Sequence, residues 1–286
     1  MAAEIETVGI VGAGFMGSGV AESVARAGLA TKVHEPASAP LEHSRERVAG
    51  SVARAVRGGK LDEVEAKALI DMIEWTEDPG ELADCDLVVE AVTEEPAVKA
   101  QVFTDLDRLL SEEAIIASNT SSIPIAQLAA ATERRDRVIG LHFFSPVPVM
   151  RLVELVVGID TSDQTVARCE VFAERIGKRP IRTKDRSGFI VNMLLVPYLM
   201  AGVRMYEDGF ATREAIDEAM RLGCGHPMGP LELADFIGLD VLYAVCDSLF
   251  EEFKRAEYAP PPLMKRMVVS GHLGRKTGRG FYEYDA

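Results

Sequence analysis

The sequence has few cysteines, fewer basic than acidic residues and no long uninterrupted apolar run. Its 4 cysteines lie far apart and include no C-x-x-C pair, so we expect neither a disulfide framework nor a zinc site, but buried, reduced thiols. Lys and Arg together number 31 against 45 Asp and Glu, which gives a net charge of −14. Because phosphate binding needs a basic face, this balance argues against nucleic acid as a partner, and we expect none.

The sequence also lacks the features of a membrane segment or an export signal. Its longest apolar stretch, residues 188–203, contains Asn192 and Pro197 and is shorter than the ~20 apolar residues that a helix needs to cross a bilayer. Residues 1–6 carry neither the basic cluster nor the apolar region of a secretory signal. We therefore predict a cytoplasmic protein with no membrane partner. Its 286 residues suffice for one large domain or two ordinary ones.

A glycine-rich turn follows the first β-prone run, at residues 7–11. It reads Gly12-Ala13-Gly14-Phe15-Met16-Gly17, and after it come a helix-compatible segment, a second β run at residues 30–34, and Glu35. This order of strand, G-x-G-x-x-G turn, helix, strand and acid is the dinucleotide-binding pattern. The first glycine permits a tight turn, the second lets the backbone approach a pyrophosphate, and the third lets helix and strand pack closely. The helix N-terminus offers free N–H groups to the phosphates.

Glu35 bears on the choice of cofactor. A carboxylate at this position can accept hydrogen bonds from the ribose hydroxyls, and it would repel a 2′-phosphate by ~1 kcal/mol or more. No arginine follows directly, since the next residues are Pro36, Ala37 and Ser38. We therefore predict NAD(H) as the cofactor in preference to NADP(H).

The pattern of the chain changes near Ser187. Before it, short β runs alternate with helical patterns, which predicts a doubly wound, Rossmann-type α/β domain over residues 1–186. After it, nearly every segment is compatible with a helix, which predicts an all-α domain over residues 187–286. The expected β runs are residues 8–11, 31–34, 87–91, 115–118, 138–141 and 152–156. The expected helices are residues 41–72 with a break at Gly58-Gly59, and 95–110, 189–206, 212–222, 231–256 and 263–270.

His142 and Glu154 are the first candidates for chemistry. Each belongs to a short apolar run, and the turn Pro146-Val147-Pro148 between the runs can bring imidazole and carboxylate together. A carboxylate beside a histidine fixes its tautomer and stabilises the imidazolium, so the ring can act as a base near neutral pH. The alternative is a histidine that only needs a hydrogen-bond partner.

Other polar residues fall near the carboxyl ends of the predicted strands, where open α/β sheets bind ligands. Glu94 follows one strand, residues 118–122 (SNTSS) follow the next, and His142 ends its own. Asn192 lies in the first helix of the second domain, where an otherwise apolar neighbourhood requires a partner for it. A cap for a nearby backbone group is an equally open interpretation of Asn192.

With these residues in view, the chain resembles the short-chain L-3-hydroxyacyl-CoA dehydrogenase family, and within it the bacterial 3-hydroxybutyryl-CoA dehydrogenases. The resemblance runs nearly end to end. Its motifs are residues 12–17 (GAGFMG), 88–91 (VVEA), 117–122 (ASNTSS), 140–144 (GLHFF), 146–150 (PVPVM), 187–192 (SGFIVN), 226–230 (HPMGP) and 278–282 (GRGFY).

The resemblance implies reversible, NAD(H)-dependent oxidation of an (S)-3-hydroxyacyl-CoA, here 3-hydroxybutyryl-CoA, to the 3-ketoacyl-CoA. It also implies a homodimer formed through the C-terminal domain and a coenzyme A thioester as the substrate. The catalytic set that it implies is His142, Glu154, Ser121 and Asn192. The cofactor-binding set is Gly12, Gly14, Phe15, Met16, Gly17, Glu35, Glu94, Lys99 and Asn119. For coenzyme A, Ser51 matches a family residue, and Arg54, Arg57 and Lys60 are candidate phosphate contacts; no metal is implied.

The chain departs from the family pattern at two positions. Ser145 stands where the family usually has asparagine, and Gly58 where it has a lysine on the coenzyme A hairpin. A solvated helix face therefore remains the alternative for Arg54, Arg57 and Lys60. Two rival functions stay open: the same chemistry on an acyl group held by acyl carrier protein, and a non-catalytic, NAD-binding structural protein.

Overall fold

The structure is a computed structural model that describes residues 4–284, and the chain divides into two compact units between Asp185 and Arg186. The division falls beside Ser187, where the sequence pattern changes. Each unit has its own apolar core.

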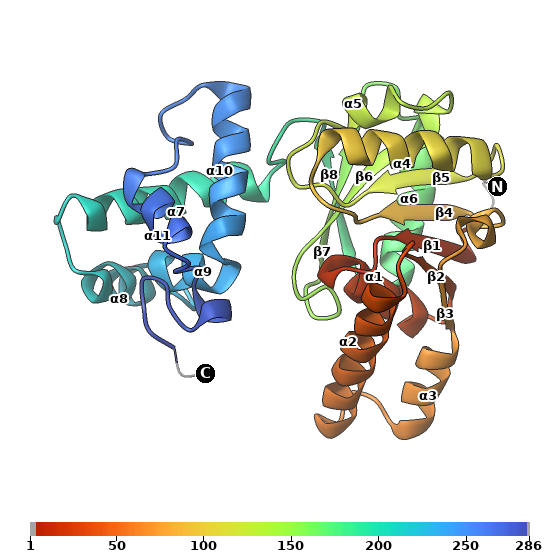
Figure 1. Ribbon diagram of the computed structural model, residues 1–286, viewed down its shortest axis with the longest axis horizontal. Coiled ribbons are helices and arrows are strands. Elements are labelled where there is room, and N and C mark those ends of the chain that lie inside the picture. The colour runs from red at the N-terminus through yellow and green to blue at the C-terminus, as the bar shows by residue number, and fades with distance from the viewer. Residues whose placement is uncertain (1–3, 285–286) are drawn as a thin grey trace. The chain divides into compact units, whose positions relative to one another are not determined.

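The first unit is built on an eight-stranded sheet (Figure 1). Its strands are β1 (Thr7–Val11), β2 (Ala30–His34), β3 (Ile73–Thr76), β4 (Leu87–Glu90), β5 (Ile115–Ser118), β6 (Val138–Phe143), β7 (Leu152–Val157) and β8 (Arg179–Lys184). Their order across the sheet is β3-β2-β1-β4-β5-β6-β7-β8, and every neighbouring pair is parallel except β6 and β7. The predicted parallel-rich, doubly wound sheet is thus confirmed.

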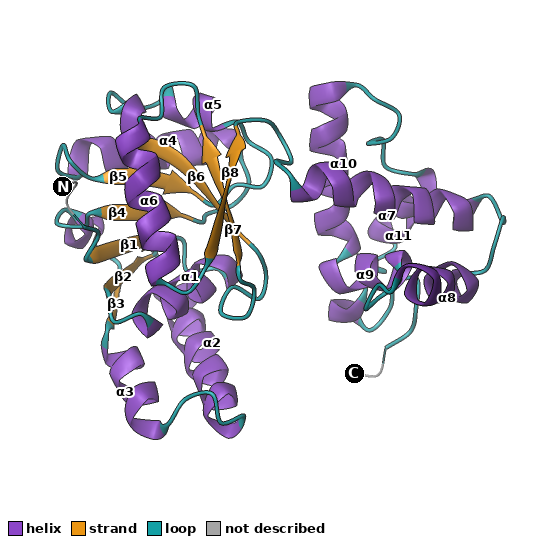
Figure 2. Ribbon diagram, turned by 180° about the vertical axis from the view of Figure 1, so that it is seen from behind, coloured by secondary structure: helices purple, strands orange, loops and turns teal. Residues whose placement is uncertain are grey.

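Helices cover both faces of this sheet. They are α1 (Phe15–Arg26), α2 (Ser38–Arg57), α3 (Glu63–Asp71), α4 (Pro96–Leu109), α5 (Ile125–Ala129) and α6 (Asp163–Arg175), with the 3-10 helices η1 (Pro79–Leu82) and η2 (Arg135–Arg137). Figures 1 and 2, which view the molecule from opposite sides, show α4 and α5 over one face and α6 over the other. Val20 and Val24 of α1, one helical turn apart, are fully buried against Val8 and Ile10 of β1 in the core of the first unit.

The predicted break between α2 and α3 is present. Gly59 has a φ of 66°, a left-handed conformation that favours glycine. Asp62 then begins α3 with a capping box, because its Oδ1 accepts the Glu65 N–H at 2.8 Å and Glu65 Oε2 accepts the Asp62 N–H at 2.9 Å. The long helix α2 and the shorter α3 therefore form a hairpin that projects from the sheet (Figure 1).

The second unit is helical. It consists of α7 (Val191–Glu207), α8 (Arg213–Cys224), α9 (Pro230–Ile237), α10 (Leu239–Phe253), α11 (Pro262–Val269) and the 3-10 helix η3 (Arg275–Thr277). The single helix expected over residues 231–256 is wrong, because Gly238 has a φ of 100° and separates α9 from α10. A right-handed helix cannot continue through that backbone conformation.

Two buried carboxylates, Asp217 of α8 and Asp235 of α9, bind residues 281–284 to these helices. Asp217 accepts the backbone N–H groups that begin α9 and the Tyr282 hydroxyl at 2.9 Å. Asp235 accepts the backbone N–H of Tyr282 and the Tyr284 hydroxyl, both at 2.9 Å. A Cβ on Gly280 would lie 2.0 Å from Asp235 Oδ1. The GRGFY motif therefore has a structural reason, which is close approach of the backbone to these carboxylates.

Three of the four thiols are buried, as predicted, but Cys224 at the end of α8 is exposed, which corrects the expectation for that residue. It lies on the solvent side of α8, whose buried positions are Ile216 and Asp217. Among residues 4–284 no helix has the length and apolar character needed to cross a membrane. The same residues contain no group of three or more His, Cys, Asp or Glu side chains arranged to hold a metal ion.

Candidate active site

The glycine turn between β1 and α1 has the geometry of a dinucleotide-binding turn. Gly12 adopts a φ of 107°, and a Cβ on it would lie 2.6 Å from the carbonyl oxygen of Ala91. A Cβ on Gly17 would lie 1.9 Å from the Gly12 carbonyl oxygen, so only glycine allows α1 to start this close to β1. At Gly14 a Cβ would meet no described atom within 4 Å. The backbone is open there, and the N–H groups that begin α1 can bind a pyrophosphate.

Two charged side chains brace this turn. Glu35, directly after β2, accepts the Ala13 N–H through Oε2 at 3.1 Å. Arg47 reaches the turn from α2 and donates to the Ala13 carbonyl oxygen at 3.0 Å and to Ser18 Oγ at 3.2 Å. The sequence pattern identifies Glu35, but a single arginine on the charged face of a long helix carries no signal, so Arg47 was not predicted.

His142 and Glu154 lie directly opposite each other in the antiparallel pair of β6 and β7. The predicted juxtaposition is confirmed, because His142 Nδ1 is 2.7 Å from Glu154 Oε2. The two residues are 4% and 0% exposed. A carboxylate at this distance accepts the Nδ1–H, which leaves the lone pair of the ring on Nε2. That nitrogen lies 3.1 Å from Ser121 Oγ, so one buried ring joins an acid to a hydroxyl.

The segment after β5 is held to the histidine strand and to Glu94. Asn119 Oδ1 accepts the backbone N–H of Phe143, the residue after His142, at 2.9 Å. Glu94 Oε1 accepts four hydrogen bonds from residues 120–122, including the Ser121 N–H at 2.8 Å. These contacts fix the backbone of Ser121, and so its hydroxyl, beside the imidazole.

A buried ion cluster lies behind Glu94. Lys99 Nζ is 2.6 Å from Glu90 Oε1 and 3.2 Å from Glu94 Oε2, and its side chain is 1% exposed. Glu90 also accepts the Val92 N–H at 2.7 Å and the Ser118 hydroxyl at 2.7 Å. Burial raises the pKa of Glu94, but the charge of Lys99 and the hydrogen bonds from residues 120–122 outweigh it, so this pKa lies below its ordinary value. The carboxylate that positions Ser121 is therefore held as an anion.

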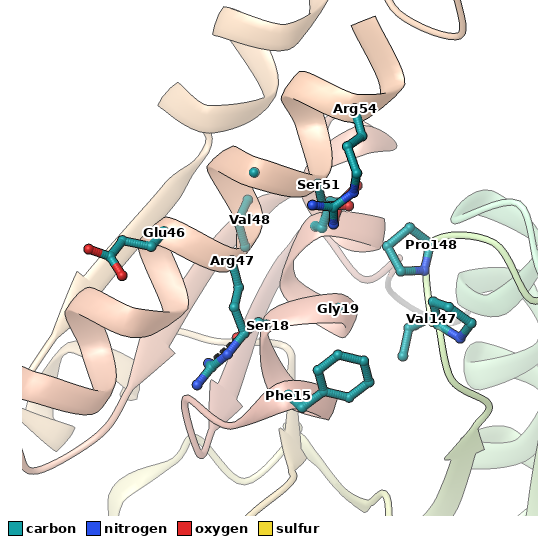
Figure 3. A pocket seen from close by; sticks show the side chains of 13 residues that line it. Phe15, Ser18, Gly19, Glu46, Arg47, Val48, Ser51, Arg54, Val147 and Pro148 are labelled. Atoms are coloured by element: carbon teal, nitrogen blue, oxygen red, sulfur yellow. Dashed lines mark hydrogen bonds between the residues drawn. The ribbon is translucent and has the colours of Figure 1, made fainter. Parts of the chain in front are cut away.

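A cavity of about 270 Å³ opens between α1, α2 and the loop that joins β6 to β7. We call it the α1–α2 pocket. Figure 3 shows Ser51 and Arg54 of α2 on one side of it and Val147 and Pro148 of the loop on the other. Its remaining lining includes both charges, with Glu22, Glu46 and Arg47. Of the four predicted coenzyme A contacts, the structure brings Ser51 and Arg54 to this pocket, whereas Arg57 and Lys60 lie outside its lining.

Asn192 belongs to the second unit. It is the second residue of α7 and is half-buried. The helix that carries it is apolar along most of its length and packs Val196, Leu199 and Met200 into the core of the second unit.

Comparison with known proteins identifies the family of this chain. Residues 7–186 match the family model for the NAD-binding domain of 3-hydroxyacyl-CoA dehydrogenase, and residues 188–284 match the model for its C-terminal domain. The chain belongs to the 3-hydroxyacyl-CoA dehydrogenase family. It is 52% identical to the 3-hydroxybutyryl-CoA dehydrogenase of Mycobacterium tuberculosis (strain ATCC 25618 / H37Rv), with 99% of this chain and 100% of that protein covered. It is 41% identical to the mitochondrial hydroxyacyl-coenzyme A dehydrogenase of Sus scrofa, with 98% and 91% covered.

Solved structures agree with these relatives. The crystal structure of (S)-3-hydroxybutyryl-CoA dehydrogenase PaaH1 from Ralstonia eutropha superposes with a TM-score of 0.94 at 45% identity, and covers 99% of this chain and 100% of that one. That of M. tuberculosis FadB2 superposes with a TM-score of 0.98 at 52% identity, and covers 99% and 100%.

The 3-hydroxyacyl-CoA dehydrogenase family implies NAD, and the residues present fit it. The glycine turn leaves room for a pyrophosphate where a Cβ on Gly14 would meet no described atom within 4 Å, and Glu35 places a carboxylate beside that turn. Phe15 and Met16 form the first turn of α1, with Phe15 61% exposed. The ammonium of Lys99, which was predicted to bind the cofactor, instead forms ion pairs with the carboxylates of Glu90 and Glu94.

Sequence reasoning included Ser118 in the polar run of residues 118–122 but missed its partner Glu90. The signal for Glu90 is present in the VVEA motif, since an acid inside a strand as apolar as β4 must have a buried partner. The identity of that partner, Lys99 of α4, follows only from the fold.

Proposed function

We propose that this chain catalyses the reversible, NAD-dependent oxidation of (S)-3-hydroxybutyryl-CoA to acetoacetyl-CoA. The observation that carries the proposal is the linked set Ser121, His142 and Glu154, with contacts of 3.1 Å and 2.7 Å on the two ring nitrogens. An alcohol oxidation needs a base for one hydroxyl proton, and this set provides one beside a dinucleotide turn. The printed functions of the M. tuberculosis and R. eutropha relatives support the choice of substrate.

In this mechanism His142 Nε2 accepts the proton of the 3-hydroxyl group. The ring becomes an imidazolium, which Glu154 stabilises through the Nδ1–H. NAD, when bound, supplies the acceptor for the hydride that leaves C3. In the reverse direction His142 returns the proton to the 3-oxygen. Ser121 Oγ orients that oxygen, where negative charge develops in the transition state. We propose the same task for Asn192, from its match to a family residue.

We propose that the α1–α2 pocket receives part of the coenzyme A carrier. Ser51 offers a hydroxyl and Arg54 a guanidinium to a phosphate from the same face of α2 (Figure 3). Arg57 and Lys60 then act only as long-range charges near the end of α2.

The test is an assay of the full chain with NADH and acetoacetyl-CoA, followed by the loss of NADH absorbance. We expect saturable turnover, faster than with longer 3-ketoacyl-CoA substrates and faster than with NADPH. Preference for acetoacetyl groups on acyl carrier protein would contradict the proposed carrier. NADH binding with no turnover of either substrate would contradict an enzymatic function and support the structural-protein alternative.

We further propose a homodimer formed through the second unit. Large apolar side chains are exposed on it, among them Leu194 at 72%, Phe210 at 79% and Phe236 at 47%. Apolar exposure of this kind marks interaction surfaces when the side chains are contiguous. Light scattering of the purified chain tests this, and a monomeric mass at micromolar concentration would contradict it. The three buried free thiols support a cytoplasmic location, which cell fractionation tests.

A further inference from the structure

Lys178 is a buried cation that the proposed mechanism does not use. It lies between α6 and β8 and is 8% exposed. Burial lowers its pKa below the ordinary value, the nearby Arg26 lowers it further, and Glu22 acts in the opposite direction. A buried ammonium is costly unless its donors are used. Its contacts therefore indicate what the residue does.

The Lys178 ammonium binds one loop at two points. Nζ donates to the carbonyl oxygens of Val147 and Met150, the latter at 3.0 Å. Within this loop, residues 146–150, the N–H groups of Val149 and Met150 both donate to the Pro146 carbonyl oxygen, at 2.9 Å and 3.0 Å. The turn thus directs two carbonyl oxygens to one cation, which holds the loop from the side of β8.

The other side of the same loop forms a wall of the α1–α2 pocket. Val147 is 2% exposed and packs so closely on α1 that a Cβ on Gly19 would lie 3.0 Å from the Val147 Cβ. Val147 and Pro148 face the pocket opposite Ser51 and Arg54 (Figure 3). The wall therefore lies between Lys178 and α1, and its place depends on both.

The position of the catalytic pair does not depend on the hydrogen bonds from Lys178 to the 146–150 loop. His142 and Glu154 are opposite one another in the register of β6 and β7, and Asn119 holds the strand beside His142. A loop between two strands can move while the paired residues of the strands stay in register. Changes at Lys178 should consequently act on carrier binding and leave the proton transfer intact.

We propose that Lys178 is a positioning residue for carrier recognition, which acts by fixing the 146–150 loop as the wall of the α1–α2 pocket. The proposal rests on the proposed function, because it takes the pocket as the site of part of coenzyme A. It adds a residue that contacts neither the substrate nor the catalytic pair but sets the affinity for the carrier.

The test compares two thioesters of the same acyl group, acetoacetyl-CoA and acetoacetyl-N-acetylcysteamine, the second of which lacks most of the carrier. For Lys178→Met we expect KM for acetoacetyl-CoA to rise about tenfold, equivalent to about 1.4 kcal/mol. The value of kcat and the Kd of NADH should stay within about twofold, and kcat/KM for the truncated thioester should be unchanged. Lys178→Arg, which keeps a cationic donor, should recover most of the loss.

The matched control is Arg179→Met, which removes one positive charge at the neighbouring, exposed position. If Lys178→Met does not fold, Lys178→Gln keeps a neutral N–H donor of similar length and should raise KM for acetoacetyl-CoA while kcat/KM for the truncated thioester stays unchanged. Equal losses on both thioesters, or an unchanged KM for acetoacetyl-CoA, would overturn the proposal. A wild-type chain that turns over neither thioester would instead overturn the proposed function, so the two failures are distinguishable.

Discussion

Replacing Lys99 by methionine is expected to destabilise the first unit by about 3–5 kcal/mol, the usual cost of leaving one partner of a buried ion pair alone. The side chains of Lys99 and Glu90 are 1% and 0% exposed, with Nζ 2.6 Å from Oε1. Without the ammonium, the Glu90 carboxylate keeps the Val92 N–H and the Ser118 hydroxyl as donors but loses its countercharge. Methionine has nearly the length of lysine, so a cavity contributes little to this cost.

A double variant separates charge from packing. Glu90→Gln with Lys99→Met removes both buried charges and should be more stable than Lys99→Met alone by about 2 kcal/mol, within the usual coupling of contacting residues. Glu90→Gln alone should cost less than Lys99→Met, because Lys99 keeps Glu94 Oε2 at 3.2 Å, on a side chain that is 42% exposed.

The assay is urea unfolding followed by the fluorescence of Trp75. This is the only tryptophan of the chain and lies in β3, so its signal reports on the first unit. A loss below about 1 kcal/mol for Lys99→Met would mean that the ion pair contributes no more than an exposed pair, contrary to the expectation. A double variant less stable than Lys99→Met would also contradict it.

Three further changes test other contacts. Glu35→Ser removes the carboxylate beside the glycine turn and should raise the ratio of NADPH to NADH efficiency about fivefold or more, the equivalent of ~1 kcal/mol; an unchanged ratio in steady-state kinetics would contradict this. Asn119→Ala leaves the Phe143 N–H without its acceptor, so we expect kcat to fall about tenfold with the Kd of NADH nearly unchanged; the reverse pattern would make Asn119 a cofactor contact. The lowered pKa of Glu94 contributes stability that is fully present above about pH 4.3 and is lost as the pH falls through the folded-state pKa. Acid unfolding curves of wild type and Glu94→Gln should therefore converge at low pH, and parallel curves would be contrary to this assignment.

The parts of the site that could be predicted are those encoded locally. The glycine turn needs small residues at fixed spacing, and a short proline-bounded turn between two apolar runs brings His142 opposite Glu154. In both cases the residues that meet are neighbours in the chain or are joined by one turn. Sequence spacing alone is then enough to place them.

The parts that could not be predicted depend on packing between distant elements. Arg47 and Lys178 reach their carbonyl partners from elements that the sequence does not pair with those loops. Strand β8 was missed because its sequence, RPIRTK, is polar and contains proline, and such a pattern predicts a loop. As the edge strand of the sheet it tolerates these residues, since one side of its backbone has no neighbouring strand.

The helix over residues 231–256 was misjudged for a different reason. Glycine is common inside apolar helical patterns, and only the backbone angle at Gly238 distinguishes a tolerated glycine from a break. The hydrogen bonds that Asp217 and Asp235 accept from Tyr282 likewise follow only from the fold.

In the proposed mechanism His142 accepts the substrate proton. This role is tested by the turnover of acetoacetyl-CoA by His142→Gln, with the Kd of NADH determined on the same preparation. We expect turnover to fall by roughly 10²- to 10⁴-fold while NADH binding stays the same, as for removal of a general base. Near-normal turnover in this variant would show that His142 is not the proton acceptor.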